Sequence, residues 1–135
     1  KSVVGQLSVV NDLNFYFAAS GKARHEERTL ERATVDTPAV VQPLVRTHPE
    51  TRRKALFVNP AYVVRFNDWT AAESRPLLEW LFAHAVQPNF TFRHRWTEGD
   101  LLMWDNRCLQ HFAVADYGSS PRTMHRVTVL GDRPA

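Results

Sequence analysis

The sequence predicts a mainly β domain, an antiparallel sandwich or jelly roll. Short apolar segments separated by turn residues recur along most of the chain, which is typical of such folds. Residues 90–96 alternate between two faces, and Phe90, Phe92 and Trp96 share one of them, which is the period of a half-buried strand. Only one segment, residues 70–85, has a clear helical pattern. The 135 residues fit one domain that can bury a core.

Residues 1–42 carry the least distinct pattern of the chain. Asn11 and Asp12 predict a turn between two short apolar elements. Residues 21–37 are polar and rich in charge, and they predict an exposed helix or a mobile loop. A packed region is expected to begin after Pro38.

A β-hairpin is predicted next. Residues 44–47 and 55–58 are short apolar segments joined by a polar turn at residues 48–51. Asn59-Pro60 ends the second segment, and residues 62–66 form a further strand-like segment.

The predicted helix has a clear start signal. Thr70 followed by Glu73 fits a capping box, in which each side chain accepts from the backbone N–H of the other residue. Pro76 would remove one helical hydrogen bond, so either the first turn is irregular or the helix begins nearer Ser74. Pro88 ends it. The apolar stripe consists of Leu77, Leu78, Leu81, Phe82 and Ala85.

The last third of the chain predicts further strands. Residues 101–104 are continuously apolar, as in a central strand, and follow a turn at residues 98–100. Residues 111–114 predict another short strand. After a loop at residues 117–121, residues 124–130 predict the last strand.

Composition excludes several classes of protein. The net charge is only +3, and the densest basic group is Arg52-Arg53-Lys54, so we expect no nucleic-acid partner. No apolar run approaches the roughly 18 residues of a membrane span, so no membrane partner is expected. The single cysteine, Cys108, excludes an internal disulfide and suits a reducing compartment, which favours the cytoplasm.

His111, Arg122 and Arg126 are the residues most suited to chemistry. A histidine at the end of a buried strand can bind a metal, although a buried histidine satisfied by a hydrogen bond is the commoner case. Arg122 and Arg126 are four residues apart, so on one strand their side chains share a face. Inward-facing arginines need an anionic partner such as a carboxylate or sulfonate, whereas outward-facing arginines need none.

The chain from about Pro43 to Pro134 resembles the taurine dioxygenase (TauD/TfdA-like) family of iron(II)- and 2-oxoglutarate-dependent oxygenases. Several motifs in the right order carry this resemblance: residues 44–51 (LVRTHPET), 55–59 (ALFVN), Gly99-Asp100, 104–111 (WDNRCLQH) and 124–132 (MHRVTVLGD). The resemblance implies a double-stranded β-helix, a cupin-like jelly roll with flanking helices. It also implies iron held by two histidines and one carboxylate.

The resemblance implies a role for each candidate residue. His111 matches the family's distal histidine ligand of iron. Arg122 matches the arginine that pairs with the far carboxylate of 2-oxoglutarate, and Arg126 the arginine near the anionic group of the substrate. Tyr62 falls where an aromatic residue of the family lines the substrate pocket; packing in the core is the alternative. Asp105-Asn106 is expected to be structural, supporting the turn before His111.

The implied activity is hydroxylation of a small anionic organic substrate, in which Fe(II), 2-oxoglutarate and O₂ take part and succinate and CO₂ are released. A sulfonate, an alkyl sulfate or an aryloxyalkanoate would each offer an anion to Arg126, so the primary substrate stays open. No catalytic side chain is expected beyond the metal site. Members of the family commonly associate, which leaves a homo-oligomer open.

One departure from the family pattern affects the site. The family's other two ligands form a His-x-Asp pair far upstream of the distal histidine, and this sequence contains no His-x-Asp. His25-Glu26-Glu27 and His48-Pro49-Glu50 are similar in form but lie too close to His111. We therefore expect residues 1–135 to be the C-terminal part of a single dioxygenase domain. The alternative is a non-catalytic, truncated β-helix domain that binds a small anion without iron.

Overall fold

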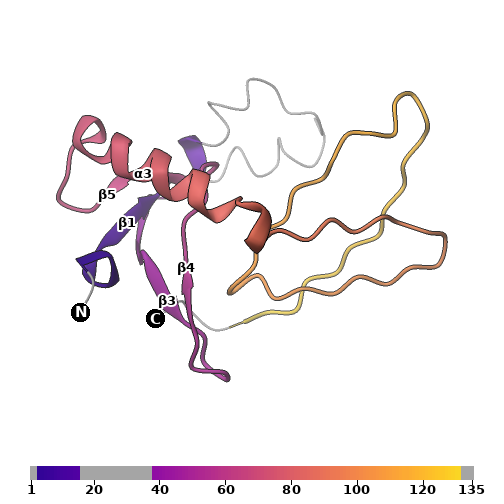
Figure 1. The fold of residues 1–135 in the computed structure, drawn as a ribbon, viewed down its shortest axis with the longest axis horizontal. Coiled ribbons are helices and arrows are strands. Elements are labelled where there is room, and N and C mark those ends of the chain that lie inside the picture. The colour runs from indigo at the N-terminus through magenta and orange to yellow at the C-terminus, as the bar shows by residue number, and fades with distance from the viewer. Residues whose placement is uncertain (1–2, 16–37, 132–135) are drawn as a thin grey trace.

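The computed structural model describes residues 3–15 and 38–131. Strand β1 (Ser8–Asn11) is the middle strand of a three-stranded antiparallel sheet (Figure 1). Its neighbours are β2 (Val40–Pro43) and β5 (Val63–Phe66). A short 3₁₀ helix, η1 (Val3–Gln6), precedes β1. The sheet thus joins three segments that are far apart in the sequence.

The turn predicted after β1 is confirmed. Asp12 follows the last residue of the strand, and its Oδ1 accepts from the backbone N–H of Asn14 at 2.8 Å. This local bond is typical of aspartate in turns. The helix or loop predicted for residues 21–37 lies outside the described residues.

The predicted hairpin is also confirmed. Strands β3 (Val45–Thr47) and β4 (Lys54–Leu56) pair antiparallel, with Arg46 opposite Ala55. In the connecting turn, Arg52 has a φ of 59° and donates its backbone N–H to the carbonyl of His48. The polar residues between the strands therefore close the turn as the sequence indicated.

Helix α3 (Ala71–Ala85) begins where the capping box predicts. The backbone N–H of Glu73 donates to Thr70 Oγ1 at 3.2 Å, and Glu73 Oε2 accepts from the backbone N–H of Thr70 at 2.8 Å. Pro76 lies inside the helix, so a start nearer Ser74 is wrong. The cap stabilises the first turn, while Pro76 has no N–H to donate to the preceding turn. A short 3₁₀ helix, η2 (Pro88–Phe90), follows α3.

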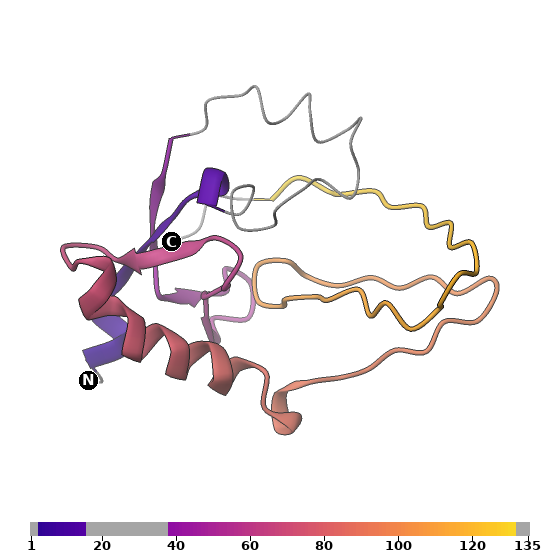
Figure 2. The same ribbon diagram turned by 90° about the horizontal axis from the view of Figure 1, so that it is seen from above.

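The core lies between helix α3, the sheet and the hairpin. Ser74 joins α3 to β5, since its Oγ accepts from the buried backbone N–H of Phe66 at 2.9 Å and its hydroxyl donates to the Thr70 carbonyl at 2.8 Å. Figure 2 shows α3 running along one side of these strands. The buried apolar residues are Val9, Leu44, Val58, Val63, Phe66, Leu78 and Leu81.

Residues 91–131 form no strand, so the strands predicted at residues 90–96, 101–104, 111–114 and 124–130 are wrong as elements of this structure. Figures 1 and 2 show this segment as long extended loops beside the core. Its apolar side chains are exposed: Leu101 is 96% and Val127 94% accessible. An alternating segment becomes a strand only when a neighbour takes its backbone N–H and C=O groups, and the described residues offer no such neighbour.

The local turns within this segment form as predicted. Gly99 has a φ of 88°, a conformation that glycine adopts readily, and the backbone N–H of Asp100 donates to the Thr97 carbonyl at 3.2 Å. Taken over the described residues, the fold is mainly β with few helices, but residues 91–131 are not assembled into the strands of a jelly roll.

Candidate functional site

The segment that leads to His111 folds around the side chain and carbonyl of Asp105. The backbone N–H of Arg107 donates to Asp105 Oδ1 at 2.8 Å, and that of Leu109 donates to the Asp105 carbonyl at 3.0 Å. An aspartate that accepts backbone bonds in this way nucleates a turn. The expectation that Asp105 supports the turn before His111 is therefore confirmed.

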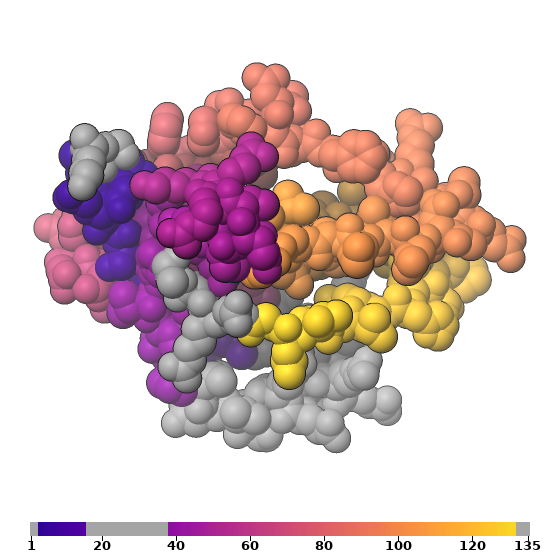
Figure 3. All heavy atoms as spheres, turned by 90° about the horizontal axis from the view of Figure 1, so that it is seen from below, coloured from indigo at the N-terminus to yellow at the C-terminus, as the bar shows by residue number. Residues whose placement is uncertain are grey.

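This turn contacts the hairpin through His48. His48 is 9% exposed, and its Nε2 lies 3.0 Å from Asp105 Oδ2, although the two residues are 57 positions apart. The backbone N–H of Thr51 donates to His48 Nδ1 at 3.2 Å. Nδ1 also lies 3.3 Å from Glu50 Oε2. In the tautomer in which Nδ1 accepts from Thr51, Nε2–H donates to the Asp105 carboxylate. Figure 3 shows the hairpin in magenta against the neighbouring orange segment.

Arg107 adds a second link between the same two segments. Its Nε and Nη2 donate to Asp105 at 2.9 Å and 2.6 Å, and its Nη1 donates to Glu50 Oε1 at 2.8 Å. Hydrogen bonds from Arg107, and then from His48, lower the pKa of Asp105 far below its ordinary value. Arg107 likewise lowers the pKa of Glu50, while Asp105 and Glu50 raise the pKa of Arg107. All three groups are thus held in their charged forms. We call His48, Glu50, Asp105 and Arg107 the clamp.

Three further contacts hold the chain next to His111. The Gln110 side-chain amide donates to the backbone carbonyl of Val58, a core residue that is 2% exposed. On the other side, Trp104 donates its ring N–H to Asn106 Oδ1 at 2.8 Å, and its ring centroid lies 4.8 Å from that of His111. The backbone before His111 is therefore held from the hairpin and from the core.

His111, Arg122 and Arg126 themselves are exposed in the structure. His111 contacts the Trp104 ring, and the guanidinium of Arg122 lies 5.7 Å from the centre of the Tyr117 ring. The described ring contacts thus link His111 and Arg122 to aromatic neighbours rather than to each other. Their predicted common face does not form here, because residues 124–130 are not paired into a strand.

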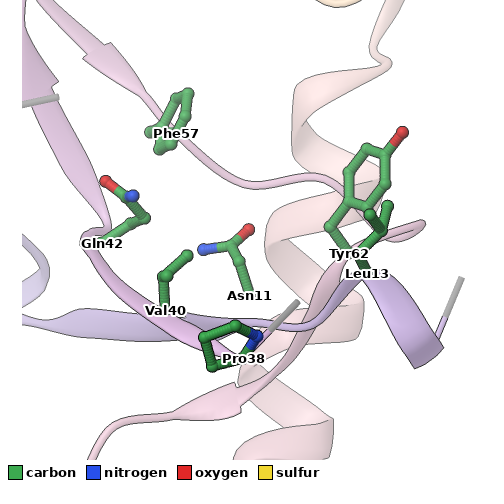
Figure 4. Close-up of a pocket in the computed structure, with 7 residues that line it drawn as sticks. All are labelled: Asn11, Leu13, Pro38, Val40, Gln42, Phe57 and Tyr62. Atoms are coloured by element: carbon green, nitrogen blue, oxygen red, sulfur yellow. The ribbon is translucent and has the colours of Figure 1, made fainter. Parts of the chain in front are cut away.

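Tyr62 lies in the wall of a pocket of about 320 Å³ (Figure 4). The lining is mostly apolar, and it includes the side-chain amides of Asn11 and Gln42. Asn11 Nδ2 is buried and has no hydrogen-bond partner among the described residues. The full lining consists of Asn11, Leu13, Pro38, Val40, Gln42, Phe57 and Tyr62. Tyr62 thus borders an open, mostly apolar hollow rather than packing in the core.

The described residues do not complete an iron site at His111. The group of three metal-type donors found among them consists of His48, Asp105 and Cys108, with ligand atoms within 4.8 Å of one another, and it does not include His111. His48 and Asp105 are already engaged in the hydrogen bonds of the clamp. Glu50 of the His-x-Glu sequence pairs with Arg107, and residues 25–27 lie outside the described part of the chain.

The clamp is the feature that the sequence did not reveal. The HPET and WDNR motifs lie in separate parts of the sequence, and only the folded structure brings them into contact. The available signal was chemical: a histidine and a carboxylate in a predicted hairpin turn, and an Asp-x-Arg sequence whose guanidinium can donate to more than one carboxylate. None of the described helices combines the length and apolar character that a membrane crossing requires.

Comparisons with known proteins agree with the motifs. The model of the taurine catabolism dioxygenase TauD, TfdA family matches residues 1–128. An alpha-ketoglutarate-dependent 2,4-dichlorophenoxyacetate dioxygenase from Burkholderia sp. (strain RASC) is 44% identical over 96 residues, which are 71% of this chain and 32% of that protein. An alpha-ketoglutarate-dependent sulfate ester dioxygenase from Pseudomonas putida is 39% identical over 125 residues, covering 90% of this chain and 41% of the relative.

Solved structures give the same result. A crystal structure described as an alpha-ketoglutarate dependent 2,4-D dioxygenase from Burkholderia xenovorans matches with a TM-score of 0.56 and 30% identity, over 70% of this chain and 35% of that one. AAD-2 in complex with Mn(II) and N-oxalylglycine matches with a TM-score of 0.55 and 29% identity, over the same shares of the two chains. The chain therefore spans about a third to two fifths of the proteins it matches. It belongs to the TauD, TfdA family of taurine catabolism dioxygenases.

Proposed function

We propose that the protein carrying this chain is an Fe(II)- and 2-oxoglutarate-dependent dioxygenase. It would hydroxylate a small anionic organic substrate, consume O₂ and 2-oxoglutarate, and release succinate and CO₂. The observation that carries this proposal is the family match over residues 1–128, together with relatives named as alpha-ketoglutarate-dependent dioxygenases. Residues 1–135 would be the C-terminal part of one domain of this kind.

The proposed fold is the cupin-like double-stranded β-helix of the family. The alternation in residues 90–96 and the apolar run at residues 101–104 support it, because these patterns fit strands that have partners on both sides. The two solved structures that match over 70% of the chain support it as well. In such a barrel, the side chains that are exposed in residues 91–131 would be divided between an inner and an outer face.

We assign His111 as one iron ligand, Arg122 as the partner of 2-oxoglutarate and Arg126 as the partner of the substrate anion. Arginine suits both anions because its planar fork donates two parallel hydrogen bonds to a carboxylate or sulfonate. The assignment requires two further iron ligands, which the described residues do not supply beside His111. The protein would act in the cytoplasm, without a nucleic-acid partner.

The substrate is proposed to be a sulfonate, an alkyl sulfate or an aryloxyalkanoate. Relatives are named for 2,4-dichlorophenoxyacetate and for sulfate esters, and these molecules share an anionic group joined to an apolar body. Tyr62 is proposed to contact the apolar body, and the largely apolar pocket that it lines supports this role.

The proposal is tested by anaerobic titration of the complete polypeptide that carries this chain with Fe(II) in the presence of 2-oxoglutarate. We expect a visible charge-transfer band that saturates at one iron per chain and needs both components. Absence of the band refutes the oxygenase assignment. Binding of 2-oxoglutarate without iron, lost in Arg122→Ala, would instead support the non-catalytic, anion-binding alternative.

A further inference from the structure

We propose that His48, in the turn between β3 and β4, is a positioning residue for His111. In this view the clamp couples the hairpin to the segment that ends at the proposed iron ligand, so that the hairpin determines where His111 stands. The part of the inference that concerns iron depends on the proposed function. The coupling between the two segments stands on the structure alone.

Hydrogen bonds within the hairpin hold His48 in place. Its backbone N–H donates to the Arg53 carbonyl at 2.8 Å, and its carbonyl accepts from the backbone N–H of Arg52 at 2.9 Å. The Thr51 N–H donates to ring atom Nδ1. These three bonds fix the backbone and the ring orientation within the hairpin, so Nε2 faces Asp105.

The hairpin contacts residues 105–107 at two places. His48 Nε2 lies 3.0 Å from Asp105 Oδ2, and Glu50 Oε1 lies 2.8 Å from Arg107 Nη1. Arg107 also donates to both carboxylate oxygens of Asp105. Because the guanidinium is rigid and planar, the two contacts define an orientation as well as a position. One contact alone would leave the segment free to pivot.

Further hydrogen bonds hold the backbone between Asp105 and His111. Asp105 accepts the backbone N–H groups of Arg107 and Leu109, which closes the turn. Gln110 then ties the residue before His111 to the carbonyl of the buried Val58. The backbone leading to His111 is thereby held at both ends of a short stretch. A metal ligand gains from such support, since coordination tolerates displacements of only about 0.2 Å.

The donor set His48, Asp105 and Cys108 suggests a different reading, in which the same residues bind a metal directly. The hydrogen bonds argue against it. His48 Nδ1 accepts from Thr51, Nε2–H donates to Asp105, and Arg107 occupies both oxygens of that carboxylate. A metal would have to displace these partners, so the group functions as a mechanical link.

The test is hydrogen exchange, read by mass spectrometry, in the complete polypeptide without metal. Replacement of His48 with leucine should speed exchange of the amides in residues 105–109 by roughly tenfold, because the turn is no longer held against the hairpin. His48→Gln, which keeps a side-chain N–H donor, should restore part of the protection. Asp116→Asn is the matched control, since it breaks the exposed Arg93–Asp116 pair of the same segment outside the clamp. It should leave exchange in residues 105–109 unchanged.

A second variant, Glu50→Gln, keeps the test decisive if His48→Leu fails to fold. Glu50 is exposed, and Glu50→Gln removes the negative charge that lies beside Arg107 Nη1 and 3.3 Å from His48 Nδ1, while the buried imidazole itself is kept. It should also speed exchange in residues 105–109. Unchanged exchange in both Glu50→Gln and His48→Leu overturns the proposal. An unfolded His48→Leu with unchanged exchange in Glu50→Gln overturns it too.

The same proteins are then titrated with Fe(II). We expect the His48→Leu variant to bind iron roughly tenfold more weakly than the wild type, which is the lower end of the range for residues that support metal ligands. Faster exchange with unchanged iron affinity overturns the positioning of His111, although the two segments remain coupled. A wild type that binds no iron refutes the proposed function, and the exchange result still decides the coupling.

Discussion

Ser74 connects helix α3 to strand β5, and its replacement by alanine gives a quantitative test of the fold. Ser74 is fully buried, as is Phe66, whose backbone N–H it accepts at 2.9 Å. In Ser74→Ala this N–H loses its partner in a place that water does not reach, which costs about 1–3 kcal/mol. Alanine's higher helix propensity returns about 0.5 kcal/mol. We therefore expect the free energy of unfolding to fall by about 0.5–2.5 kcal/mol.

Urea denaturation followed by tryptophan fluorescence measures this loss. Trp69 reports on the joint, because its ring centroid lies 5.0 Å from that of Phe66 in an edge-on contact. With a typical denaturant dependence of about 1.5 kcal/mol per molar, the midpoint should fall by roughly 1 M. Arg75→Ala is the control, since its pair with Glu79 is exposed, and its midpoint should not move. An unchanged midpoint for Ser74→Ala would show that the Phe66 N–H does not depend on Ser74, and the reasoning would fail.

Two further predictions concern the proposed ligands and the clamp. Arg122→Ala should raise the 2-oxoglutarate concentration needed for half-maximal rate far more than it alters selectivity among substrates. Arg126→Ala should first raise KM for the anionic substrate. Steady-state kinetics measure both effects, and an unchanged substrate KM in Arg126→Ala contradicts the role of Arg126. The pKa values of Asp105 and Glu50 are lowered in the folded protein, chiefly by Arg107. Their stabilisation should therefore be complete above the ordinary carboxylate pKa of about 4 and be lost as the pH falls through the lowered values. Near-ultraviolet circular dichroism measures the loss of folded structure as the pH falls. Asp105→Asn should show a weaker acid transition than the wild type, and an identical transition would contradict the link.

Features that depend on neighbouring residues could be predicted from the sequence. The Thr70–Glu73 capping box sets the start of α3 because both partners lie within one helical turn. The hairpin of β3 and β4 follows from two apolar segments and a polar turn between them. The turn around Asp105 forms for the same reason, since its bonds reach only to Arg107 and Leu109.

Pairings between distant segments could not be predicted in this way. Nothing local indicates that β1 would lie between β2 and β5. Residues 90–96 have the period of a strand and still form none, because a strand exists only with a partner for its backbone groups. The roles of His111, Arg122, Arg126 and Tyr62 remain predictions for the same reason, since a site needs the elements around it.

The order of its motifs determined the family of this chain, and its short-range signals determined the helix, the hairpin and the turn before His111. The short-range signals depend on residues close together in the sequence, whose contacts do not require the rest of the fold. Only the tertiary structure decided that His48 meets Asp105 across 57 residues and that Gln110 reaches the carbonyl of Val58. Such contacts form when the core brings two segments together, and the periodicity of one segment does not indicate which distant segment it will contact.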